Sequence, residues 1–200
     1  VMIGISVLNG DTTTAKMLRS WAVVYLGNFL GAVLLALACS RFGQLDYSQG
    51  GLAVYTIKTA AAKCSLPFGN GVVLGILCNI LVCAGVLCSL SAKDTAGRIL
   101  GAYIPVAFFV ICGFEHCVAN MYYVPAGLFA LQMPPYAAQA AEAGIDVSML
   151  SWGNFLLHNL LPVTLGNILG GLFVGITMWA CHLKKATLAA ARKQGSSHAG

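Results

Sequence analysis

Glu115 and His116 carry the strongest chemical signal in the 200-residue sequence, because they stand in the middle of an apolar run. A charge at the centre of a membrane helix costs at least about 2.5–3.5 kcal/mol on insertion scales, so residues of this kind usually serve a function. Gly113 before the pair, and Asn120 and Pro125 after it, are typical of an interrupted helix.

Each member of the pair has two interpretations. The Glu115 carboxylate could bind the free backbone N–H groups that a break exposes, and we favour this loop-stabilising role for it. His116 could be a satisfied core residue, but a histidine changes its charge near neutral pH and this one stands at the break, so we favour a functional role. The second half of an interrupted helix also turns its N-terminus toward the bilayer centre, where it attracts anions.

Further polar candidates stand before and within other apolar runs. Lys63 comes just before the run that begins at Phe68, and it is either a solvated loop charge or a collector of anions at a pore mouth; Lys58 competes with it for that role. Asn79 and Asn167 lie within apolar runs, where an amide must find a partner, and hydrogen bonding between helices is the simpler account for Asn167 and for Asn28.

Phe109 and Val82 are ordinary core residues by type, but in a pore they would form hydrophobic constrictions that exclude hydrated ions. Motifs for other chemistry are absent: the sequence has no Walker loop, no Rossmann glycine pattern and no Cys-x-x-Cys. Glu115, His116 and Cys117 are neighbours in sequence and do not converge on one metal without further ligands. We therefore expect no cofactor, no metal and no enzymatic activity.

Composition identifies the class of protein in which these residues must be placed. Charged residues make up 8% of the chain and hydrophobic ones 58%, the mean hydropathy is +0.82, and the net charge is +5. A soluble domain carries roughly 25% charge, so a water-soluble monomer and a disordered chain are excluded, and no basic stripe indicates nucleic acid as a partner. The chain reads as an all-α polytopic membrane protein, and most of its eight cysteines lie in apolar runs as small buried hydrophobes.

Apolar runs of about 20 residues predict the membrane segments. We expect them at residues 17–40, 68–90 and 152–183, with a broken segment over 99–131, the end of a broken helix over 1–8, and a polar cytoplasmic tail over 184–200. Eight Lys and Arg residues fall on one side of this arrangement and three on the other, which predicts a cytoplasmic C-terminus.

An internal repeat links the first of these segments to the last. Residues 27–32 and 166–171 both read Gly-Asn-apolar-Leu-Gly-small, at an offset of 139 positions, on segments predicted to run in opposite directions. This is the pattern of an inverted repeat, although small-residue packing alone could also produce it. The repeat predicts on the order of 60–70 further residues ahead of Val1, holding one membrane segment and the first part of a second.

The run from Gly113 to Met121 reads Gly-Phe-Glu-His-Cys-Val-Ala-Asn-Met and resembles the signature of the formate/nitrite transporter family. Residues 25–32, 75–79 and 162–167 are similar to the family in the same order, and the resemblance covers residues 1–183. It implies an aquaporin-like fold of six membrane segments, the second and fifth broken, assembled as a homopentamer with a pore in each protomer. By this resemblance His116 is the central pore histidine, Glu115 its neighbouring carboxylate and Lys63 a vestibule lysine.

The resemblance also implies the remaining site and the activity. Asn79, Asn120 and Asn167 fall on polar positions of the family, and Phe109 and Val82 on constriction positions. The expected function is passage of a small monovalent anion, formate first, through the cytoplasmic (inner) membrane, linked to protonation near His116. Nitrite, hydrosulfide and lactate stay open as substrates. A neutral-solute facilitator and a membrane-embedded enzyme using Glu115 and His116 are the rivals from other classes.

Overall fold

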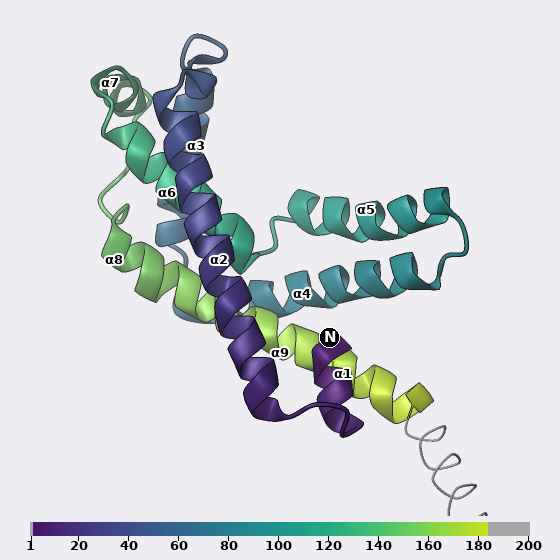
Figure 1. Ribbon diagram of the computed structural model, residues 1–200. Helices are drawn as coiled ribbons and strands as arrows, with labels where there is room; N and C mark the ends of the chain where they lie inside the picture. Colours follow the sequence, from purple (N-terminus) through teal and green to yellow (C-terminus); the bar gives the residue numbers. More distant parts are fainter. Residues whose placement is uncertain (1, 184–200) are drawn as a thin grey trace, which may run out of the picture.

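The computed structural model describes residues 2–183, and this part of the chain is helical with no strands (Figure 1). Its long helices lie where the apolar runs predicted them, and shorter helical pieces fill most of the connections. The elements are α1 Met2–Leu8, α2 Thr14–Arg41, η1 Gln44–Asp46, α3 Gly51–Cys64, α4 Phe68–Ser91, α5 Thr95–Ile111, α6 Cys117–Leu131, α7 Pro134–Glu142, α8 Trp152–Asn154, η2 Phe155–Leu160, α9 Leu161–Met178 and η3 Trp179–Leu183.

Among residues 2–183, three helical stretches are long and apolar enough to cross a membrane: Thr14–Arg41, Phe68–Ser91 and Trp152–Cys181. The segments expected at residues 17–40, 68–90 and 152–183 fall on them. The expected broken segment is divided into α5 and α6, which are separated by a break of five residues, 112–116. The predicted cytoplasmic tail, residues 184–200, lies outside the described part of the chain.

Helix α3 is the main difference from the sequence-based expectation. No membrane segment is predicted over residues 51–64, where the structure has a helix of 14 residues that carries Lys58 and Lys63. A helix of this length is too short to span a bilayer. The chain enters α3 through Ser48, Gln49 and Gly50, which all have positive φ (58°, 58° and 89°) and turn it back beside α2. Lys63 is therefore on a helix, not in a solvated loop.

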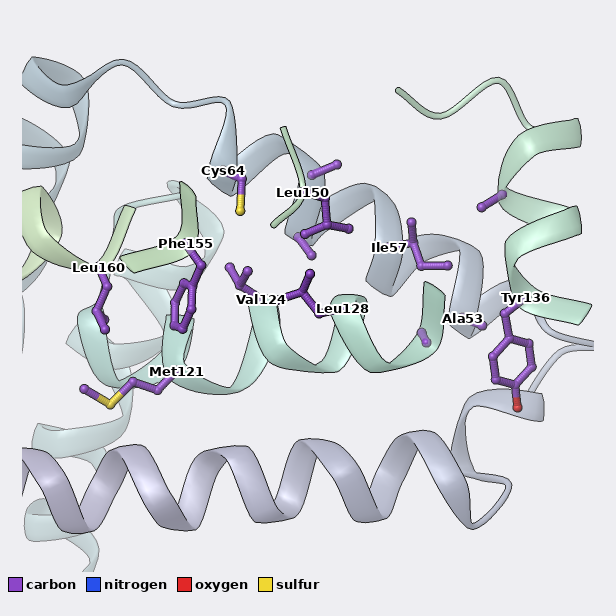
Figure 2. Packing of buried hydrophobic residues seen from close by; sticks show 14 of the residues in the cluster. Ala53, Ile57, Cys64, Met121, Val124, Leu128, Tyr136, Leu150, Phe155 and Leu160 are labelled. Atoms are coloured by element: carbon purple, nitrogen blue, oxygen red, sulfur yellow. The ribbon is translucent and has the colours of Figure 1, made fainter. Parts of the chain in front are cut away.

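One hydrophobic cluster joins α3, α6 and η2, with α7 at its end (Figure 2). Helix α6 lies in the middle, with α2 along one side and α3 along the other, and this packing orders α3 although α3 is short. Fully buried members come from all three central elements: Ile57 of α3, Met121 and Val124 of α6, and Phe155 of η2. The cluster thereby fixes the end of α3 relative to the start of α6.

Glycines bring α4 and α9 into close contact. A Cβ atom on Gly75 would lie 2.8 Å from the Val163 carbonyl oxygen, and one on Gly166 or Gly170 would clash with a carbonyl of α4. Small residues that let two backbones approach are the usual packing device of membrane helices. The equivalent glycine of the repeat, Gly27 on α2, has open space around its Cβ position.

Two residues related by the repeat offset meet in the structure. The Tyr25 hydroxyl of α2 lies 2.8 Å from the Thr164 hydroxyl of α9, and the two positions are 139 residues apart. The hydrogen bond joins equivalent points of the two repeat-related helices, as expected for residues near a pseudo-two-fold axis.

Candidate functional site

Two interruptions of the helical backbone meet at the centre of the molecule. One separates α3 from α4 at residues 65–67, where Pro67 is the N-cap of α4, and the other separates α5 from α6 at residues 112–116. Gly113 has φ 69°, in the left-handed region that glycine adopts without strain, so it can turn the chain at the end of α5. The Glu115 N–H then donates to the Leu74 carbonyl of α4, 3.4 Å away.

An ion pair bridges the two interruptions. Lys63 Nζ lies 2.8 Å from Glu115 Oε1, with side-chain exposures of 15% and 8%. The same ammonium lies 5.6 Å from the centre of the Tyr123 ring. Lys58, in contrast, is exposed and takes no part in this pair. Removing one partner of a buried pair costs about 3–5 kcal/mol, so the pair also holds the two breaks together.

Asn120 completes the environment of the Glu115 carboxylate. Its Nδ2 donates to Glu115 Oε2 at 2.6 Å and to Asn159 Oδ1 at 2.8 Å. Its own Oδ1 is the one buried side-chain oxygen or nitrogen without a hydrogen-bond partner among residues 2–183. Asn120 is 0% exposed, so its side chain is enclosed beside the ion pair and does not face a solvent-accessible surface.

Asn167 binds the exposed backbone of the break. Its Oδ1 accepts the Cys117 N–H at 2.9 Å, and its Nδ2 donates to the carbonyls of Glu115 at 3.0 Å and Gly75 at 2.9 Å. We had expected the Glu115 side chain to do this work. The structure corrects that mechanism, because both Glu115 oxygens are taken by side-chain donors and the amide of Asn167 is better suited, offering a donor and an acceptor together.

His116 is the N-cap of α6. Its Nδ1 accepts the Ala119 N–H at 3.3 Å, and its ring stacks on Phe109 with centroids 5.7 Å apart and an interplanar angle of 21°. A ring that uses Nδ1 as an acceptor carries its proton on Nε2. The break therefore places a histidine and an aromatic residue of the predicted constriction side by side.

Asn79 and Val82 lie on α4, and Asn28 lies on α2. The Asn79 side chain donates to the backbone carbonyl of Asn167, so the expected hydrogen bond between helices is present. Val82, one turn further along α4, is half-buried. Asn28 is exposed and has no hydrogen bond among the described residues, unlike its repeat equivalent Asn167.

A cavity of about 960 Å³ opens beside this region, between α1, α2 and α9. Its wall is largely apolar, with a few polar side chains, among them Tyr25, Asn28, Asn79, Thr164 and Asn167. Lys63 and His116 are not among its lining residues. The hydrogen-bonded group around Glu115, which includes Lys63, Asn120, Asn159 and Asn167, is called the central network below. In the described part of the chain, the cavity reaches this network at Asn167 and does not reach the ion pair of Lys63 and Glu115.

Two parts of this arrangement were not predicted from the sequence. Asn159 belongs to the buried network, and Tyr25 forms the contact with Thr164. The signal for Asn159 was present, because an amide within an apolar run must find a partner, which is the rule that drew attention to Asn79. The signal for Tyr25 was its repeat offset from Thr164, which pairs two residues of different type.

Comparison with known proteins assigns the chain to a family. The family model described as "Formate/nitrite transporter" matches residues 1–180. Among curated relatives, "Formate channel FocA" of Haemophilus influenzae is 38% identical over 166 residues, covering 82% of this chain and 58% of the relative. "Formate channel FocA" of Escherichia coli K12 is 35% identical over 188 residues, covering 92% of this chain and 66% of the relative.

Solved structures give the same result. "Pentameric formate channel with formate bound" matches with a TM-score of 0.75 and 35% identity, over 84% of this chain and 67% of that one. "FNT family ion channel" matches with a TM-score of 0.66 and 28% identity, over 87% and 63%. The chain spans 58–66% of the length of the two FocA relatives. It is a multi-pass membrane protein, and it belongs to the formate/nitrite transporter family.

Proposed function

We propose that the chain forms part of a channel for small monovalent anions, with formate as the foremost substrate. The observation that carries this proposal is the buried pair of Lys63 and Glu115 at the meeting point of two interrupted apolar helices, next to His116. A cation in an apolar membrane protein lowers the cost of bringing an anion out of water. Relatives named as formate channels support formate in particular.

Lys63, paired with Glu115 where the two interruptions meet, attracts anions toward this point of the path. The apolar surfaces of Phe109 and Val82 then make a bare charge costly, so hydrated ions are excluded. His116 stacks on Phe109 and supplies a proton or a cationic field at the point where desolvation of the anion costs most. The solute crosses either as the anion or as the neutral acid after proton transfer; desolvation of a carboxylate favours the acid form.

The three asparagines divide into two roles. Asn79 and Asn167 line the cavity beside α9, so we assign them to the path wall. Asn120 is fully buried and binds Glu115, so it acts by holding the ion pair. Glu115 itself is the counter-charge that keeps Lys63 in place, and it is not a ligand of the solute.

Assembly and location extend the proposal to the whole protein. We infer a homopentamer in the cytoplasmic (inner) membrane, with a pore in each protomer and a cytoplasmic C-terminus. The pentameric channel among the structural relatives supports the assembly, and the excess of Lys and Arg on one side supports the orientation. The relatives are named as channels and transporters, which favours transport over a membrane-embedded enzyme.

The experiment that tests this function uses the protein expressed from its complete gene and reconstituted in liposomes. Formate uptake should be saturable and should change steeply with pH between about 5 and 8, where a histidine titrates. His116→Phe should flatten that pH dependence, while Lys58→Met, which removes an exposed lysine of α3, should leave it unchanged. Unaltered pH dependence in His116→Phe would remove the role assigned to His116.

Nitrite, hydrosulfide and lactate remain substrate alternatives within the same family, and each should be offered beside formate. Ranking their initial rates at one pH identifies the substrate. Glycerol uptake as fast as formate uptake would favour a neutral-solute facilitator instead.

A further inference from the structure

Asn159 lies at the junction of the central network, on a stretch of π-helix. Segment η2, Phe155–Leu160, has π geometry, and the Leu161 N–H bonds the Leu156 carbonyl five residues earlier. Asn159 is 0% exposed, whereas its neighbour His158 is exposed. Single-turn π segments inside helices are frequent at functional sites.

The sequence explains why the helix widens here. Pro162 has no N–H to donate to the His158 carbonyl, and its ring would clash with that carbonyl in a regular α-helix. A π turn moves the carbonyl away and changes the direction of the side chains within the turn. The widened turn holds Asn159 against the ends of α3 and α6.

The contacts of Asn159 tie together both partners of the ion pair. Its Nδ2 donates to the main-chain carbonyl of Lys63 at 3.0 Å and lies 3.5 Å from Glu115 Oε2. Its Oδ1 accepts from Asn120 Nδ2, which also binds Glu115 Oε2. Lys63 is thus held at its backbone by Asn159 and at its ammonium by Glu115.

We propose that Asn159 is a positioning residue for anion passage: its neutral amide sets the place of Lys63 and keeps the central cluster at one positive and one negative charge. This inference rests on the proposed function, in which Lys63 attracts the anion. Asn159 touches neither the solute nor the path and acts through Lys63 and Glu115.

The test replaces the amide by its near-isosteric carboxylate. Asn159→Asp removes both N–H donations and adds a second carboxylate beside Glu115, so a single lysine faces two negative charges. Like charges this close cost several kcal/mol, so the half-saturating formate concentration should rise by about tenfold or more. The assay is initial formate uptake into liposomes, with protein that elutes as the wild-type assembly.

A second substitution separates positioning from packing. In Asn159→Asp combined with Glu115→Gln, the cluster again holds one positive and one negative charge, and the half-saturating concentration should return toward the wild-type value. Asn154→Asp is the matched control, because it makes the same change five residues earlier, at the end of α8, at a partly exposed position. We expect no change in half-saturation for this control.

Two results would overturn the proposal. The first is a wild-type half-saturating concentration in Asn159→Asp. The second is a loss in Asn159→Asp that the added Glu115→Gln does not reverse, which would mean that Asn159 only fills space.

A readout independent of transport keeps the inference separate from the proposed function. The melting temperatures of wild type, both single variants and the double variant form a cycle, in which the double variant should be more stable than the sum of the single losses predicts. If wild-type protein carries no anion, the proposed function fails, and the cycle still decides whether residues 159 and 115 are coupled. Additive losses would refute the coupling.

Discussion

Asn167 should contribute more to stability than any other single amide in the break, because it binds three buried backbone groups. In Asn167→Ala the Cys117 N–H and the carbonyls of Glu115 and Gly75 lose their partner together. Hydrogen bonds between membrane helices average about 0.6 kcal/mol, which gives a lower bound near 2 kcal/mol for three. Buried groups left unsatisfied cost about 1–3 kcal/mol each, which gives an upper bound near 9 kcal/mol.

The size of the loss should follow the number of bonds removed. Unfolding by a graded increase of denaturing detergent in mixed micelles, followed by helical circular dichroism, measures the free energies. Asn154→Ala, on a partly exposed amide with a single backbone acceptor at Met149, is the control and should lose less than about 1 kcal/mol.

A loss of less than about 1 kcal/mol in Asn167→Ala would refute the reasoning, because it lies below even the lower bound for three bonds. A loss in Asn167→Ala no larger than that in Asn154→Ala would contradict it as well, since the first variant removes three bonds to the backbone and the second removes one.

Three further changes test other parts of the structure. Lys63→Met leaves its buried carboxylate partner unpaired and should cost about 3–5 kcal/mol in the same unfolding assay, and a loss under about 1 kcal/mol would argue against a buried pair. Gly75→Ala brings a Cβ within 2.8 Å of a carbonyl of α9 and should cost about 1–3 kcal/mol. Gly153→Ala, at a position with open space around it, is the control and should be neutral. Equal effects of the two changes would contradict the close packing of α4 and α9. Tyr136→Phe removes the 2.6 Å hydrogen bond from the Tyr136 hydroxyl to Asp46 Oδ1, in the connections outside the membrane segments, and should cost about 1.5 kcal/mol at neutral pH. That hydrogen bond, with burial and the carboxylate charge, raises the pKa of Tyr136. The difference in free energy of unfolding between variant and wild type should therefore be full below about pH 10 and vanish as pH rises through the raised pKa. A difference that persists at higher pH would exclude the hydrogen bond as its source.

The sequence was most informative where a polar or charged residue occurred within an apolar run. An acidic residue and a histidine in an apolar run predicted the break between α5 and α6, because a charge at that depth needs an exceptional environment. Hydropathy predicted the long helices for a similar reason, since few alternatives exist for 20 apolar residues.

Helix α3 was missed because its order comes from tertiary contacts. Ile57 and Cys64 are buried against α6 and η2, and no property of residues 51–64 alone reveals those partners. The pairing of Lys63 with Glu115 was missed for the same reason. A lysine outside the predicted membrane segments could not be matched with a carboxylate 52 residues later.

The roles of the amides also needed the structure. Asn28 and Asn167 stand in equivalent sequence contexts, yet only Asn167 has hydrogen bonds in the described residues. The difference lies in what each helix faces: α9 packs against α4 and the break, whereas the wall of α2 near Asn28 borders the cavity. Sequence pattern identifies residues that need a partner and cannot say which partner they find.

The most direct measurement of the central claim is formate flux through wild-type protein expressed from its complete gene. Liposomes containing the folded assembly are mixed rapidly with formate over about pH 5 to 8, and the volume or current change is recorded beside empty liposomes. We predict a protein-dependent formate flux that changes steeply with pH and exceeds glycerol flux. No flux of formate, nitrite, hydrosulfide or lactate through correctly assembled protein would contradict it.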